Sequence, residues 1–163
     1  MKIIMFLFVA VLLNLFAGES CREEAKLVVK NAEEIVYQFN AGPLPPEYQR
    51  NFTVTLNKVN AKLRFQAYGK KPTEKTVKTG DVKFKEIMEL AGKAEIRKDG
   101  EKKNDGCTGG TSESLKILDV KRTVTFSGYF YHCGGTDYGD LTGDIKLLKT
   151  KITSFFPNEE YLK

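Results

Sequence analysis

Side chains that commonly hold metals or carry out acid–base chemistry are scarce in this 163-residue sequence. It contains one histidine, His132, and three cysteines. A structural zinc site needs about four closely spaced ligands, and the adjacent His132 and Cys133 would point to opposite faces of a strand. A Cys-X-X-Cys redox pair is also absent. The sequence therefore predicts no metal site and no cofactor.

The single histidine also limits the possible catalytic arrangements. Any His-dependent triad or general base must use His132. In its predicted strand, His132 falls on the same side as Phe130, so we expect a partly buried structural histidine. Ser112 and Ser114 lack the nucleophile-elbow context of hydrolases. We therefore predict a protein without enzymatic activity.

Three acidic residues, Asp137, Asp140 and Asp144, lie close together in the sequence. Oxygen ligands near a glycine-rich loop would suit a weak calcium site, but their spacing fits no EF-hand loop. We favour a second interpretation, in which these acids lie at the start of the last helix and its dipole stabilises them.

Long basic tracts are absent too. The net charge is +5, but the lysines are scattered along the chain. Nucleic-acid-binding domains usually carry a basic stripe together with a recognition motif. The sequence therefore predicts no nucleic-acid partner and a solvated, lysine-rich surface.

The only long apolar run lies at the N-terminus. Lys2 precedes a stretch from Ile3 to Gly18 that is almost entirely apolar. A basic start, an apolar run and small residues are typical of a secretory signal peptide, which we place at residues 1–20. An uncleaved anchor helix is the alternative, although the run is a little short for a membrane span.

Cys21 directly follows this segment and leaves two interpretations open. It could be the lipid-modified cysteine of a bacterial lipoprotein; Ser20 fits the residue expected before it, whereas Glu19 does not. Acylation would account for the odd cysteine of an exported protein and would attach the chain to a membrane. A cut after Ala17 without lipidation is the other possibility. Either way we expect a periplasmic, outer-membrane-anchored or extracellular protein.

The remaining chain has the length of one domain. We expect a tether over residues 21–33 and a single α+β domain over residues 34–163, with two helices packed on antiparallel hairpins and one disulfide. The predicted strands cover residues 34–40, 51–56, 61–68, 76–79, 114–118 and 123–132, and the predicted helices residues 81–92 and 142–155. Asp81 is expected to cap the first helix. Lys146, Lys149 and Lys151 should face solvent on the last helix, and residues 93–105 should form a charged loop.

The segment AGPLPPEYQ, residues 41–49, interrupts regular structure. Its three prolines cannot donate to a strand ladder and favour an extended loop. Leu44, Pro45, Pro46 and Tyr48 form a candidate partner-binding loop, because such a loop has little conformational entropy left to lose on binding. A linker or packing loop is the alternative.

Cys107 and Cys133 flank the second predicted hairpin. Counting outward from its turn at residues 119–122 brings the two cysteines nearly into register. Export provides an oxidising compartment, and closing such a loop contributes about 3–4 kcal/mol in the chain-entropy model. The pairs Gly109-Gly110 and Gly134-Gly135 would let the chain turn beside each cysteine. We predict a structural disulfide.

Several segments carry a resemblance to known proteins. GCTGG, VTFSGYFYHCGG and GDLTGDIKLLKTKITSFFP resemble the C-terminal half of small exported or lipoprotein-like bacterial domains of uncharacterised function, and AGPLPPEYQ with the following hairpin resembles their N-terminal half. The order of elements is also similar to that of emfourin, a protein inhibitor of thermolysin-type metalloproteases. The resemblance implies an exported domain and assigns no residue to an activity.

Together these features predict an exported, non-enzymatic module that binds a protein or envelope partner. A secreted protease inhibitor is the first alternative. A hydrolase whose site carries no recognisable motif is the second.

Overall fold

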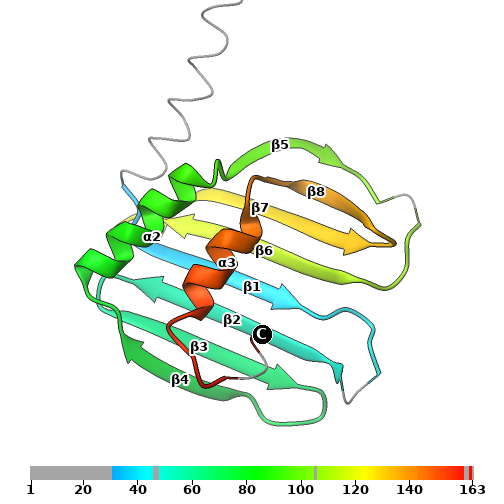
Figure 1. Ribbon diagram of the computed structural model, residues 1–163, viewed down its shortest axis with the longest axis horizontal. Helices are drawn as coiled ribbons and strands as arrows, with labels where there is room; N and C mark the ends of the chain where they lie inside the picture. Colours follow the sequence, from blue (N-terminus) through cyan, green and yellow to red (C-terminus); the bar gives the residue numbers. More distant parts are fainter. Residues whose placement is uncertain (1–30, 46–47, 105, 160–161, 163) are drawn as a thin grey trace, which may run out of the picture.

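Eight antiparallel strands form one sheet, and two helices pack across one of its faces (Figure 1). The computed structural model describes residues 31–45, 48–104, 106–159 and 162. The predicted signal peptide, Cys21 and Pro46 lie outside the described residues. The arrangement confirms the predicted α+β fold with helices on an antiparallel sheet.

The strands lie in the order β4-β3-β2-β1-β6-β7-β8-β5, and each neighbouring pair is antiparallel. Two pairings join segments far apart in the sequence: β1 lies beside β6, and β5 lies beside β8. The strands are β1 Glu34–Asn40, β2 Arg50–Asn57, β3 Asn60–Ala67, β4 Thr73–Lys78, β5 Arg97–Lys102, β6 Thr111–Leu118, β7 Val124–Cys133 and β8 Thr136–Thr142. The helices are α2 Asp81–Lys93 and α3 Ile145–Thr153.

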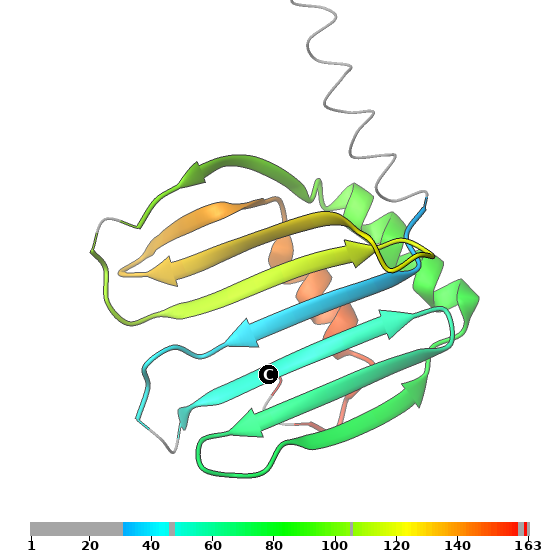
Figure 2. The same ribbon diagram turned by 180° about the vertical axis from the view of Figure 1, so that it is seen from behind.

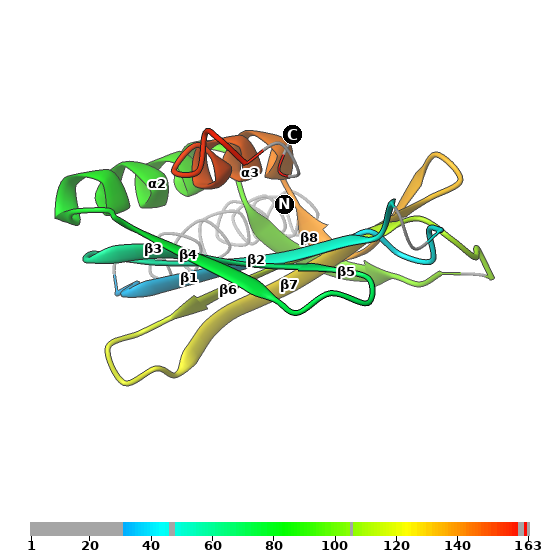
Figure 3. The same ribbon diagram turned by 90° about the horizontal axis from the view of Figure 1, so that it is seen from below.

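The hydrophobic core lies between the sheet and the two helices (Figure 3). Side chains alternate between the faces of a strand, so every second residue of the central strands points toward the helices. On β1, Ile35 and Tyr37 are fully buried in this way. The helices fill the same space with residues at helical spacing: Phe84, Ile87, Met88, Ala91, Ile145, Leu148 and Ile152. Short helices gain most of their stability from this burial.

Local signals determine where each helix begins. Gly80 is the N-cap of α2 in place of the predicted Asp81, which lies in the first turn and forms an ion pair with Lys85 at 2.6 Å. Asp144 caps α3, because its side chain accepts a hydrogen bond of 2.9 Å from the backbone N–H of Leu147. In the described part of the chain, neither helix has the length and apolar character needed to cross a membrane.

Two strands correct the predicted element boundaries. β5 occupies part of the predicted charged loop at residues 93–105, and β8 occupies residues before and at the predicted start of the last helix. Every residue of β5 is exposed, so it lacks the apolar alternation that reveals a strand in a sequence. β5 is extended because β8 provides backbone hydrogen-bonding partners along its edge. The last helix is consequently shorter than residues 142–155.

The β6–β7 hairpin differs from the predicted register. Thr125 is an extra residue in β7, at a bulge. Leu118 already pairs with Val124, one residue beyond Thr123, so the turn and the bulge together move the partner of Ser112 by two positions, from Tyr129, which counting outward from the turn gives, to Tyr131. The bulge shifts the pairing but keeps both cysteines at the same end of the sheet.

Candidate functional site

Four connections lie at one end of the sheet, beyond the part that the helices cover (Figures 1 and 2). One is the β3–β4 turn; the other three are the β1–β2 loop, the connection from β5 to β6, and the tight turn between β7 and β8. We call these three connections the loop end. They bring together the proline-rich segment and both glycine pairs that the sequence singled out.

The predicted disulfide is present and lies at the loop end. Cys107 and Cys133 are bonded, with their Cα atoms 6.2 Å apart. Asn104 holds the Cys107 backbone from both sides: its side chain accepts from the Cys107 N–H at 2.9 Å and donates to the Cys107 carbonyl at 3.0 Å. The Tyr131 hydroxyl donates to the Gly109 carbonyl. These bonds fix the path of the chain into β6.

The proline-rich loop rests directly on this disulfide-linked segment. Gly42 lies so close to the Gly110 carbonyl that a Cβ added at Gly42 would overlap its oxygen. Gly110 is in turn packed against the His132 carbonyl in the same way. Both glycines have positive φ, 68° and 110°, which favours residues without a Cβ. The backbone segments at Gly42, Gly110 and His132 are thus in direct contact. A side chain at either glycine would prevent this contact.

The candidate binding residues of the loop are exposed. Leu44 is 42% and Tyr48 59% exposed, and Pro45 also faces solvent. Backbone hydrogen bonds hold the described parts of the loop: the Leu44 N–H donates to the Gly42 carbonyl at 2.9 Å, and the Tyr48 N–H to the Pro45 carbonyl at 2.8 Å. At its base, the Asn51 side chain accepts from the Ala41 N–H at 3.1 Å. Residues 41–45 and 48–49 therefore present apolar side chains from hydrogen-bonded backbone.

His132 does not have the expected partly buried position. Its side chain is 53% exposed, and Nδ1 lies 2.6 Å from a carboxylate oxygen of Asp137 across the β7–β8 turn. The prediction failed because this end of β7 extends past the helices that cover the core (Figure 1). Ser112 pairs with Tyr131, the neighbour of His132, so the serine and the histidine lie on opposite faces of the sheet.

The three acidic residues Asp137, Asp140 and Asp144 have separate partners. Asp140 is buried, lies 2.8 Å from the Lys98 ammonium and accepts a hydrogen bond from the Tyr129 N–H at 2.9 Å. Burial by itself would raise the pKa of Asp140, but these two partners outweigh it and lower the pKa. Only Asp144 stabilises the start of α3 as expected. Within the described ranges, no group of three metal-ligating side chains is positioned to hold an ion.

A buried polar cluster beneath α3 was not predicted. The Glu113 side chain is 10% exposed; its carboxylate accepts a hydrogen bond from the Tyr37 hydroxyl and lies 3.2 Å from the Lys149 ammonium. Lys149, expected to face solvent, is 25% exposed and lies 4.4 Å from the centre of the Phe39 ring. Burial, and then the Glu113 carboxylate, raise the pKa of Tyr37, so its hydroxyl keeps its proton.

This cluster has a structural role. Its charged and hydrogen-bonding groups satisfy one another, which is what a buried carboxylate requires. The contacts join α3 to β1 and β6. The signal in the sequence was Glu113 itself, a charged residue in line with Leu115 and Ile117 on the apolar side of its strand.

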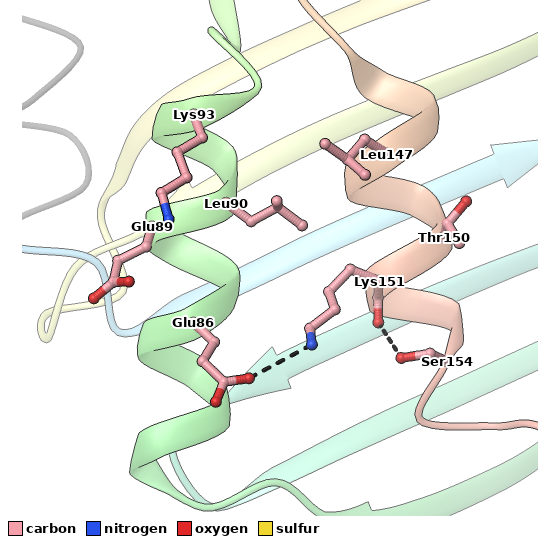
Figure 4. Close-up of a pocket in the computed structure, with 8 residues that line it drawn as sticks. All are labelled: Glu86, Glu89, Leu90, Lys93, Leu147, Thr150, Lys151 and Ser154. Atoms are coloured by element: carbon pink, nitrogen blue, oxygen red, sulfur yellow. Dashed lines mark hydrogen bonds and ion pairs between the residues drawn. The ribbon is translucent and has the colours of Figure 1, made fainter.

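A groove of about 600 Å³ runs between the two helices (Figure 4). Leu90 and Leu147 point toward each other across it, and Glu86 and Lys151 form an ion pair of 3.5 Å that joins α2 to α3. The groove offers a small apolar surface, and the ion pair partly bridges it.

The chain matches no protein-family model, no curated protein and no solved structure. The function must therefore be argued from the geometry of the chain itself.

Proposed function

We propose that this protein is an exported, non-enzymatic module that binds a partner protein through its loop end. The observation that carries the proposal is the pair of exposed side chains, Leu44 and Tyr48, on a loop that is anchored at Gly42 against the disulfide-linked segment. Binding residues are often found on loops that a rigid scaffold positions.

The energetics of binding favour this loop over other exposed surfaces. A partner that binds a flexible loop must offset the entropy lost on ordering it, whereas an ordered loop avoids much of that cost. Proline restricts the backbone further at Pro43 and Pro45. Tyrosine is among the residues that contribute most to protein interfaces. Its side chain is large but has few rotatable bonds, so it loses little conformational entropy on binding. Tyr48 and Leu44 thus supply apolar contact area at low entropic cost.

A secreted protease inhibitor is the more specific alternative, and Leu44 favours it. The residue is exposed between Pro43 and Pro45, so the bond that follows it is a tertiary amide and the backbone on both sides is restricted. A side chain presented in this way could enter a protease cleft while the loop resists the rearrangement that cleavage requires. The resemblance to emfourin in the order of elements expected from the sequence suggests the same class of inhibitor as a hypothesis.

Site-specific photo-crosslinking in the source organism tests the leading proposal. A photoreactive phenylalanine replaces Tyr48 in one protein and, in the control, Val120, a residue of the β6–β7 turn at the other end of the sheet that is even more exposed than Tyr48. We expect a discrete protein adduct at position 48 that is absent at position 120 and is lost when Leu44→Asp is added. Equal adducts at both positions, or an adduct that is insensitive to Leu44→Asp, would contradict the proposal.

Inhibition assays test the alternative. Thermolysin and the secreted peptidases of the source organism are titrated with the wild-type protein, with Leu44→Asp and with the control Val120→Asp. An inhibitor that acts through the loop should lose at least tenfold in potency with Leu44→Asp only. Full peptidase activity in the presence of excess wild-type protein would exclude inhibition of these enzymes.

Export and anchoring are tested separately from binding. The intact mass of the mature protein from its native host reports the cleavage site and any acyl chain at Cys21. If Cys21 is acylated, Cys21→Ser should move a folded protein from the membrane fraction to the soluble fraction. A mature chain that begins at Gly18 without a lipid would exclude the anchor.

A further inference from the structure

No helix or loop of the described residues covers the face of the sheet opposite α2 and α3 (Figures 2 and 3). It is a different surface from the loop end, and its chemistry is also different. Strand pairing determines which side chains lie next to one another on this face, because residues directly opposite in neighbouring strands share a face.

One row of this face crosses six neighbouring strands without a charged side chain. Asn40 is central: it pairs with Asn51 on one side and with Ser112 on the other. On one side, Asn51 pairs with Gln66 on β3. On the other side, Ser112 pairs with Tyr131 on β7, and Tyr131 pairs with Tyr138 on β8. From β3 to β8 the row reads Gln66, Asn51, Asn40, Ser112, Tyr131 and Tyr138. Every member carries an amide or a hydroxyl group.

The absence of charge in this row contrasts with the chain as a whole, in which 29% of residues are Asp, Glu, Lys or Arg. We call it the amide row. The neighbouring row contains one cation close to it, Arg64, and the cross-strand partner of Arg64 is Glu74. The carboxylate of Glu74 lies 2.8 Å from the ammonium of Lys62, and the Lys102 ammonium lies 5.5 Å from the centre of the Tyr138 ring at the β8 end of the row. Cations therefore flank the row, but the side chains of the row itself offer a ligand only neutral hydrogen-bonding groups.

The amide row borders a shallow hollow of about 230 Å³. The hollow is lined mainly by polar side chains: Gln38, Asn40, Asn51, Thr53, Arg64 and Gln66, with Phe52. Weak hydrogen bonds of 3.3 Å align the amides, from Gln38 to Asn40 and from Asn40 to Ser112. Each amide offers both a donor and an acceptor, so the hollow can bind a ligand that also offers both.

We propose that the amide row binds an uncharged polysaccharide chain laid across the strands. Neighbouring hydroxyls of a sugar ring donate and accept at the same time, which matches side-chain amides. Strands lie about 4.8 Å apart, so the polar groups repeat at an interval close to the length of one pyranose residue. Tyr131 and Tyr138, with ring centres 6.3 Å apart, add apolar ring surface for the C–H faces of a sugar at the β8 end.

A protein partner fits this face less well than a glycan does. Protein interfaces depend on a few large, fully desolvated anchors such as Trp, Tyr and Arg, packed into pockets. The hollow is shallow and is lined by amides, and its guanidinium, that of Arg64, lies opposite a carboxylate. The large apolar side chains that protrude most at the loop end, Leu44 and Tyr48, belong to the proline-rich loop and not to the amide row.

Affinity electrophoresis in native gels containing hydroxyethylcellulose, and calorimetry with fully N-acetylated chitohexaose, which is uncharged, test the proposal. The variant Gln38→Ala/Gln66→Ala removes two amides from exposed positions, where little loss of stability is expected. The matched control, Lys62→Ala/Lys116→Ala, removes two cations from the same face, in the row beyond that of Arg64. We expect the wild type and the lysine control to bind at least one of the two glycans, and the glutamine variant to bind at least tenfold more weakly.

Several results would overturn the proposal. These are absence of binding to both neutral glycans at millimolar concentration, unchanged binding by the glutamine variant, and binding to heparin alone that is lost in the lysine control. A protein adduct formed by a photoreactive residue at position 66 would assign the face to a protein instead. If thermal melting shows that the glutamine variant is unfolded, Gln66→Arg takes its place. Leu44→Asp should leave glycan binding unchanged, which separates this proposal from the function of the loop end.

Discussion

Replacing both Cys107 and Cys133 with alanine tests how much the loop end depends on its cross-link. The disulfide joins residues 26 apart in the sequence. In the chain-entropy model, the entropy that a cross-link removes from the unfolded chain grows with the logarithm of loop length, which for this loop gives about 3.5 kcal/mol at 25 °C. Cys133 is buried, so truncating its side chain adds a small packing loss. We expect the free energy of unfolding to fall by about 3–5 kcal/mol.

Urea denaturation followed by far-UV circular dichroism measures this change, since the chain has no tryptophan to report by fluorescence. Peptide mapping without reductant first establishes that the bond is present in the wild type. A loss below about 1 kcal/mol would refute the entropic reasoning, and finding both thiols free would refute the bond itself. Crosslinking at Tyr48 in the variant, well below its melting temperature, then shows whether the loop keeps its conformation.

Three further predictions concern the core, the loop anchor and the buried acid. Leu148→Ala should lower the free energy of unfolding by about 2–5 kcal/mol because Leu148 is fully buried. Lys146→Glu, a change at an exposed position of the same helix, should alter the free energy of unfolding little. Equal melting temperatures for the two variants would contradict the role of α3 in the core. Gly42→Ala should destabilise the protein more than Gly69→Ala, measured by urea denaturation, because both glycines have φ near 68° but only Gly42 contacts a neighbouring backbone; equal losses would show that the contact is unimportant. The pKa of Asp140 is lowered on folding, so its contribution to stability is present at neutral pH and is lost as the pH falls through that lowered pKa. Asp140→Asn should therefore reduce stability at pH 7 and lose its effect only when the pH falls below the lowered pKa of Asp140, and an effect independent of pH would refute the ionic explanation.

Much of the fold could be predicted from local patterns. The alternation of Ile35 with Tyr37, and the helical spacing of Ile145, Leu148 and Ile152, reflect a single constraint: each element must turn one face to the core. These elements were found because each has one apolar face and one polar face. β5 has no buried face, and therefore no periodic signal.

The candidate site was only partly predictable. The proline-rich loop and the two cysteines are visible in the sequence because proline, glycine and cysteine have specific covalent or conformational properties. Their contact through Gly42 and Gly110 is not visible, because it joins backbone segments that are almost seventy residues apart. The predicted burial of His132 was also wrong. Alternation along a strand indicates which face a residue is on but not whether a helix covers that face.

The sequence by itself thus determined the α+β class, the core-facing residues of most elements and the pairing of Cys107 with Cys133, because these follow from periodicity and from the proximity of hairpin ends. Only the tertiary structure decided which segments lie side by side. The pairing of β1 with β6 brings Tyr37 next to Glu113 and aligns Asn40 with Ser112. Both the buried cluster and the amide row arise from such juxtapositions. They depend on the order of the strands in the sheet, and the same local sequence patterns are compatible with several strand orders.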